Sequence, residues 1–158
     1  MNIKLVTVGK LQPIFLQAQE EFRKRLSRFC KLEIIEVPDR QAPEHLSEAD
    51  KVSVMLNESE LLLKKIENNE FIIALDSTGI ALSSIELSEK LQSLQNAGNS
   101  NITFIIGGSL GLHPMVLKRA SYILSLSRMT FTHSLARIVL IEQLYRSFKI
   151  NSNQPYHK

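Results

Sequence analysis

The segment from 106 to 112 is the first candidate for chemistry, because three glycines follow an apolar run. Gly107, Gly108 and Gly111 carry no Cβ, so a ligand could approach the main chain closely. The segment matches neither the dinucleotide fingerprint nor the P-loop pattern. No lysine or arginine occurs between residues 103 and 117. If the segment binds a ligand, the pattern favours a nucleoside-like molecule without phosphates over a phosphate-rich one. On the loop alone, a tight structural turn is the favoured interpretation.

A second candidate is the loop Leu126–Phe131, which mixes apolar side chains with backbone groups free to bond a ligand. It comprises Leu126, Ser127, Arg128, Met129, Thr130 and Phe131. Alone, it has the composition of an ordinary connecting loop. A third loop, 75–79, follows the apolar run Phe71–Leu75.

Two histidines and their neighbours are candidates for proton chemistry. His133 and Arg137 are four residues apart, so they share one face near the start of the last predicted helix. A neutral histidine at a helix N-terminus can accept a proton, although a lone histidine also serves structural roles. Tyr156, His157 and Lys158 could stack on a base and contact phosphate, with a frayed terminus as the favoured alternative. Glu142 and Arg146 have the spacing of a solvated i,i+4 ion pair.

Alternating strands and helices must position these residues. Apolar runs predict five strands, at 3–8, 32–37, 71–75, 102–106 and 122–126, with amphipathic helices between and after them. This order predicts a single α/β domain over 1–158, with a mostly parallel sheet and helices on both faces. In such sheets ligands bind beyond the carboxyl ends of the strands. The three loops would form one pocket if the strand order brings them together.

Composition restricts the remaining classes of function. The chain has 158 residues and a net charge of +3, which permits nucleic acid as a partner without requiring it. A lone Cys30 excludes an internal disulfide, and no spacing of metal ligands occurs, so no metal is predicted. No apolar run approaches the length of a membrane span. We expect a cytoplasmic protein that binds no membrane.

Taken together, these motifs resemble the ribosomal large-subunit RNA methyltransferase H family, a group of the SPOUT class. The resemblance covers the whole chain, and its order and spacing are more specific than any single motif. It rests on Val6–Lys10, Ile106–Gly108, Gly111–Leu112, Leu126–Ser127, Met129–Thr130, His133 with Arg137, Glu142–Arg146 and Tyr156–Lys158.

The resemblance implies a homodimer whose C-terminal part forms a deep trefoil knot. It also implies a bent S-adenosylmethionine held by the knot loops, at Leu75, Gly107 with Gly108, and the stretch 126–131. The implied reaction is methylation of N3 of a pseudouridine in 23S ribosomal RNA, on the assembled 70S ribosome. A SPOUT enzyme acting on another RNA, such as transfer RNA, and a ribosome-associated module without catalysis are the alternatives.

The resemblance also suggests roles for individual side chains. Arg137 is the first candidate for stabilising charge or contacting phosphate. His133 and His157 are candidates for handling the N3 proton, and Tyr156 for stacking on the base. Thr132 stands where the family often has proline. Because threonine is a competent N-cap, we expect a small change in helix entry and no loss of activity.

Overall fold

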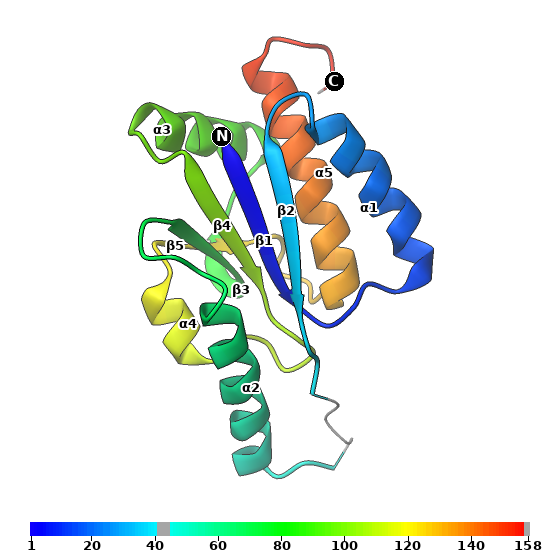
Figure 1. The fold of residues 1–158 in the computed structure, drawn as a ribbon, viewed down its shortest axis with the longest axis vertical. Helices are drawn as coiled ribbons and strands as arrows, with labels where there is room; N and C mark the ends of the chain where they lie inside the picture. The colour runs from blue at the N-terminus through cyan, green and yellow to red at the C-terminus, as the bar shows by residue number, and fades with distance from the viewer. Residues whose placement is uncertain (41–44, 157–158) are drawn as a thin grey trace.

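Five parallel strands form one sheet in the order β2-β1-β4-β3-β5 (Figure 1). The computed structural model describes residues 1–40 and 45–156. The strands are β1 (Asn2–Val8), β2 (Lys31–Val37), β3 (Phe71–Ala81), β4 (Asn101–Ile106) and β5 (Tyr122–Ser125). The α/β class and the parallel sheet predicted from the alternating pattern are confirmed.

Helices cover both faces of this sheet, as predicted. On one face lie α1 (Pro13–Leu26), α3 (Ser84–Asn96) and α5 (His133–Asn151); on the other lie α2 (Glu48–Leu63) and α4 (Pro114–Arg119). Each face has its own apolar core. Phe104 and Leu140 are fully buried in the first core, and Val6 and Leu62 in the second. Central strands buried on both faces explain the nearly continuous apolar runs in the sequence.

Side-chain caps begin α2, α3 and α5. Ser47 accepts a hydrogen bond from the Asp50 N–H, and Thr132 accepts one from the Leu135 N–H. Ser83 and Glu86 form a reciprocal capping box. The predicted competence of Thr132 as an N-cap is confirmed, and α5 begins directly after it.

The third strand departs from the prediction. The strand does not end at Leu75 but continues to Ala81, with a register shift against β5 between Leu75 and Ile80. Within the shift, Asp76 Oδ1 accepts hydrogen bonds from both the N–H and the hydroxyl of Thr78. The polar residues 76–79 therefore form a bulge inside a strand. They resemble a loop in composition, which is why the sequence predicted one there.

The carboxyl ends of all five strands lie at the same edge of the sheet, because the strands are parallel. In Figure 1 the arrowheads point away from the end where the chain starts and where α5 finishes. The two ends of the sheet therefore carry different segments of the chain. No helix in the described ranges combines the length and apolarity that a bilayer crossing requires.

Candidate functional site

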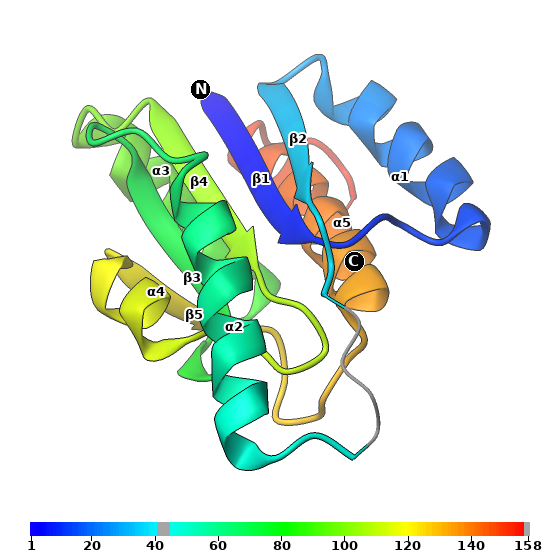
Figure 2. The same cartoon turned by 60° about the horizontal axis from the view of Figure 1, so that its bottom comes forward.

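The loops predicted to bind a ligand leave one edge of the sheet. β4, β3 and β5 are parallel neighbours, so the loops 107–112 and 126–131 start side by side with Leu75, which pairs with Leu124 (Figure 2). We call Leu75 and these two loops the loop edge. Two of the three loops predicted to converge therefore start side by side, whereas the third, 75–79, is part of β3. The binding of a cofactor there stays a prediction.

The segment 126–132 crosses this edge from end to end. It begins after the outer strand β5, and His133, the residue that follows it, lies near Gly9 at the end of β1. Since β3 and β4 lie between β5 and β1 in the sheet, the segment passes the ends of both. Any molecule bound beyond β3 and β4 would therefore contact this segment.

The glycine loop after β4 folds tightly on itself. A Cβ on Gly107 would lie 2.7 Å from the carbonyl carbon of Gly111, and the Gly111 N–H donates to the Gly108 carbonyl at 3.1 Å. Gly111 has a φ of +84°, a conformation that favours glycine. The tight structural turn is thus present, and the side chains of Leu112 and Glu58 lie against its backbone.

The second loop exposes apolar side chains. Met129 is 74% exposed and Phe131 37% exposed, although residues of these types are usually buried. Local hydrogen bonds hold the backbone of this loop. Ser127 Oγ accepts one from the Met129 N–H, and the Ser125 hydroxyl donates one to the Ser127 carbonyl. The loop therefore presents apolar groups on a fixed backbone, as a surface that binds an aromatic ligand would.

His133 lies at the same edge, at the start of α5. Its Nε2 is 3.5 Å from the position that a Cβ on Gly9 would occupy, and the Asp39 Oδ2 is 3.8 Å from that same position. The ends of β1 and β2 and the start of α5 therefore meet around Gly9, whose φ is +78°. An imidazole and a carboxylate near the loop edge give this region groups that can accept a proton.

Arg137 does not have the expected position. Its side chain is fully buried, and Nη1 donates to Glu36 Oε1 at 2.6 Å and to Gln19 at 3.3 Å. Nη2 donates to the Gly9 carbonyl at 3.0 Å. This burial argues against a direct phosphate contact, because the guanidinium is inside the protein, whereas the role of Arg137 in stabilising charge stays a prediction. Arg137 instead ties α5 to the ends of β1 and β2.

Of the predicted tail residues, Tyr156 lies at the other end of α5. The Tyr156 ring packs edge-on against Tyr145, with ring centroids 4.8 Å apart, and Arg146 lies over it at 4.7 Å. Tyr145 is twelve residues from His133, which corresponds to roughly 18 Å along a helix. Within one chain the structure therefore does not bring Tyr156 to the loop edge. His157 lies outside the described residues.

The ion pair expected one helical turn apart near this end is confirmed. Arg146 Nη2 and Glu142 Oε1 are 2.6 Å apart, but the side chains are only 25% and 20% exposed. The Tyr156 hydroxyl donates to the same carboxylate at 3.4 Å. Burial, and then the Glu142 carboxylate, raise the pKa of Tyr156. The tail is therefore packed onto α5 up to Tyr156, and the pair is not fully solvated.

Sequence reasoning missed Glu58, which is 3% exposed and lies against the glycine loop. A Cβ on Gly108 would be 2.8 Å from its Oε2, an atom without a hydrogen-bond partner among the described residues. Burial, with Asp39 nearby, raises the pKa of Glu58 to about 6, against the donation from the Arg40 N–H. A signal existed, because Glu58 is four residues before the buried Leu62 on one helical face.

No group of three or more metal-ligating side chains comes together in the part of the chain that the structure describes. The loop edge presents backbone groups, exposed apolar side chains and Arg128, with the imidazole of His133 and the carboxylates of Asp39 and Glu58 close to it. Such a set can hold an uncharged or aromatic ligand by stacking and main-chain bonds.

Comparison with known proteins identifies the family. The family model described as "Predicted SPOUT methyltransferase" matches residues 1–157. A ribosomal RNA large subunit methyltransferase H from Alkaliphilus oremlandii is 54% identical, and one from Clostridioides difficile is 50% identical, each over 100% of both chains. The chain belongs to this family of SPOUT methyltransferases. The methyltransferase class implied by the motif pattern is thereby confirmed.

Solved structures support the fold independently. A probable methyltransferase from Bordetella pertussis matches with a TM-score of 0.59 at 12% identity, over 92% of this chain and 93% of that one. A probable methylase family protein from Haemophilus influenzae matches with a TM-score of 0.56 at 14% identity, over 99% of this chain and 70% of that one. At these low identities, the similarity shows that this chain has the same fold as the two solved proteins.

Proposed function

We propose that the protein methylates N3 of a pseudouridine in 23S ribosomal RNA, on the assembled 70S ribosome in the cytoplasm, with S-adenosylmethionine as the donor. The observation that carries this proposal is full-length identity of about half to relatives named for methylation of large-subunit ribosomal RNA. The loop edge supports it, because two of the predicted ligand-binding loops follow β4 and β5, the two strands that flank β3.

The residues of the loop edge fit this methyl donor. The donor has an adenosine and an amino acid part but no phosphate, which suits a glycine loop without cations. Leu75, Gly107 and Gly108 would lie beside it, with Met129 and Phe131 as exposed apolar contacts. When bound, S-adenosylmethionine supplies an electrophilic methyl group on a sulfonium. We further propose that the segment 126–132 belongs to a trefoil knot.

The protein must place a deprotonated N3 about 3–3.5 Å from the methyl carbon and in line with the sulfur. His133 is positioned to help, because its imidazole lies at the loop edge beside Asp39. We assign it to accepting or relaying the N3 proton. Arg137 acts at a distance, since its buried guanidinium fixes the start of α5 and so the position of His133.

The tail residues can reach such a site only in a dimer. Tyr156 packs near Tyr145 and Arg146, far along α5 from the loop edge of its own chain. A second copy, placed with its tail against the first copy's loops, would bring Tyr156 and His157 to the bound base. We therefore propose a homodimer in which each site takes Tyr156 for stacking and His157 for proton handling from the partner.

Transfer of labelled methyl groups tests this function. Purified protein and labelled S-adenosylmethionine are incubated with 70S ribosomes from cells lacking the gene, with separated subunits, or with transfer RNA. We expect label in the 23S RNA of the 70S particle. Label in transfer RNA alone would identify another SPOUT substrate. Ribosome binding and donor binding without any label would contradict catalysis.

A further inference from the structure

The net positive charge of the chain arises from one short segment. Residues 22–32 contain five basic and no acidic residues, which leaves 14 basic against 16 acidic residues elsewhere. The net charge of +3 therefore comes from this segment, and the rest of the chain is slightly acidic. We call its cations the basic corner: Arg23, Lys24, Arg25, Arg28 and Lys31.

All five side chains belong to exposed residues at the end of α1 and the start of β2. Glu20 approaches Arg23 at 3.5 Å and Glu21 approaches Arg25 at 2.6 Å. Among the described residues, no carboxylate lies within 4 Å of Lys24, Arg28 or Lys31. The helix dipole accounts for cations in the last turn of α1, but Arg28 and Lys31 lie beyond that turn.

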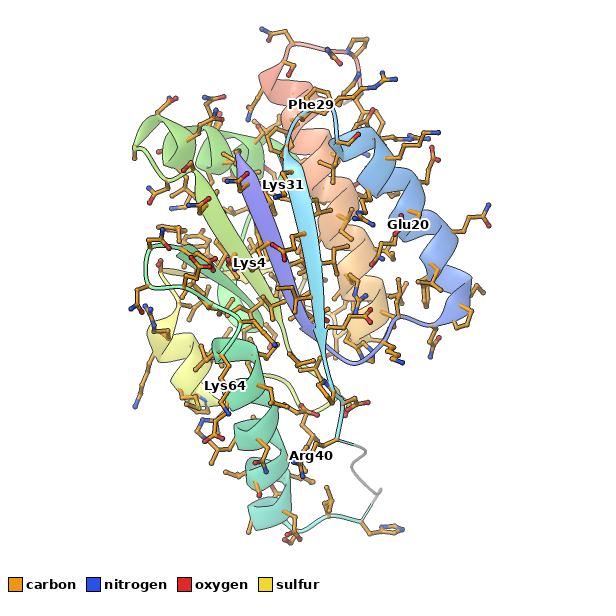
Figure 3. The ribbon with its side chains drawn as sticks, in the orientation of Figure 1. Lys4, Glu20, Phe29, Lys31, Arg40 and Lys64 are labelled. Carbon is orange, nitrogen blue, oxygen red and sulfur yellow. The ribbon has the colours of Figure 1, made fainter. Side chains whose placement is uncertain are left out.

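A surface groove gives these cations a shape that can hold an extended ligand. The open groove has a volume of about 550 Å³ and is lined by Arg23, Arg28, Phe29 and Lys31, together with the first residues of β1. Figure 3 shows Phe29 and Lys31 at the end of the molecule where the strands begin, and Arg40 at the other end. Cations around an aromatic side chain are a combination suited to a nucleic acid strand.

The basic corner is continuous with the tail. Arg25 lies 5.9 Å from the Tyr145 ring, and Phe29 packs against that same ring with centroids 6.1 Å apart. Tyr145 in turn contacts Tyr156. Groove and tail therefore form one surface, separated from the loop edge of the same chain by the length of the sheet.

We propose that the basic corner holds the phosphate backbone of the substrate RNA next to the target base, and that it serves the loop edge of the second copy. This inference rests on the proposed function and its dimer. A surface that carries the tail to the partner's site also carries the basic corner there. The same contact explains how a loop edge with few cations can act on a polyanion, because the partner provides the charge.

Charge reversal tests the contact with RNA. The variant is Arg28→Glu with Lys31→Glu, and the matched control is Lys64→Glu with Lys118→Glu, which changes net charge equally on the face of α2 and α4. We expect the KM for ribosomes to rise about tenfold or more in the variant. The dependence of this KM on salt concentration should become weaker. The control should stay within about twofold of the wild type. S-adenosylmethionine affinity should be unchanged in both.

Mixed dimers test whether the contact is made in trans. One chain carries the two corner substitutions, and the other carries a cofactor-site substitution, either Gly107→Ala or Thr130→Trp on the exposed loop. At ribosome concentrations below the wild-type KM, the cofactor-site homodimer should be inactive and the corner homodimer should keep about a tenth of the wild-type rate. The mixed dimer should regain about half of the wild-type activity, because one of its two sites is complete. The two tags used for purification confirm that mixed dimers form.

Two outcomes would overturn the inference. One is an unchanged KM in the corner variant; the other is a mixed dimer that forms but stays inactive, which would place the contact in cis. A wild-type protein that binds donor but methylates no RNA would instead contradict the proposed function. In that case filter binding of ribosomes by the corner and control variants still decides whether the basic corner contacts RNA.

Discussion

The two ends of the sheet differ in the chemistry that they offer. At the carboxyl end of the strands, the loop edge presents glycines, exposed Met129 and Phe131, and a backbone held by short bonds. At the amino end, the basic corner presents five exposed cations beside aromatic rings. One end suits a small ligand without phosphate, and the other suits a polyanion.

This difference supports the proposed division of labour between two copies of the protein. Methyl transfer needs the donor and the RNA at the same place, but the sheet separates the two surfaces within one chain. Pairing unlike ends of two copies would join them. The predictions below test each end separately, in order of decreasing expected effect.

The largest effect is expected at the loop edge. Gly107→Ala should weaken S-adenosylmethionine binding by about 100-fold or more, because the new Cβ would lie 2.7 Å from a backbone atom of Gly111. Titration calorimetry measures the affinity. Gly98→Ala is the control, since no atom lies within 4 Å of its Cβ position and its φ of +85° adds only local strain. Equal donor affinity in both variants would remove Gly107 from the site.

Substitution of Arg137 should lower the stability of the protein, and should affect turnover only through that loss of structure. Arg137→Met leaves Glu36 without its buried partner and should lower the free energy of unfolding by about 3 kcal/mol, measured by urea denaturation. Glu142→Gln, which loosens the more exposed pair with Arg146 at the other end of α5, should cost less than about 1 kcal/mol. Full stability of Arg137→Met with lost turnover would restore the direct catalytic role that the structure argues against.

The tail should affect turnover without affecting donor binding. His157→Ala should lower kcat on ribosomes by about tenfold or more, as expected for a group that handles a proton. Tyr156→Ala should act similarly, through lost stacking on the base. Calorimetry with S-adenosylmethionine serves as the control measurement. Unchanged turnover of His157→Ala would remove that residue from the mechanism.

Glu58 should give the smallest effect and a distinct pH dependence. Its pKa is about 6 in the folded protein against the ordinary 4.5, so the folded state binds the extra proton between these values. Stability therefore falls as pH rises from about 4.5 to about 6, and the full cost, about 1 kcal/mol once solvent screening is allowed for, is present above that window. Glu58→Gln should stabilise the protein by about this amount at pH 7.5.

The comparison that isolates this effect is the exposed neighbour Glu60→Gln, which should leave the melting temperature nearly unchanged. The gain of Glu58→Gln over the wild type should shrink when the pH is lowered to 4.5. A gain of equal size at both pH values would mean that the carboxyl of Glu58 is not the cause.

Local sequence patterns predicted much of this fold, whereas features that depend on long-range contacts could not be predicted. The caps at Ser47, Ser83 and Thr132 depend on residues three positions apart and were visible in the sequence. The loop edge followed from strands that alternate with helices. In contrast, Arg137 meets Glu36 across 101 residues, and no i,i+4 spacing could predict that its charge is neutralised inside the protein.

The bulge in β3 and the buried Glu58 show the same limit. Asp76 to Gly79 has the composition of a loop, yet Gly79 packs so tightly on β5 that a Cβ would lie 2.7 Å from the Ile123 backbone. Only the pairing with β5 reveals a strand there. Glu58 lies on an apolar helical face, but its contact with Gly108 depends on where α2 docks.

The most direct test of the proposed activity is mass spectrometric mapping of 23S ribosomal RNA. RNA is taken from cells that lack the gene and from the same cells carrying it on a plasmid, either wild type or as Gly107→Ala. We predict one methyl group on N3 of a single pseudouridine, present only with the wild-type gene. The same modification in cells without the gene, or a methyl group at another position, would contradict the account.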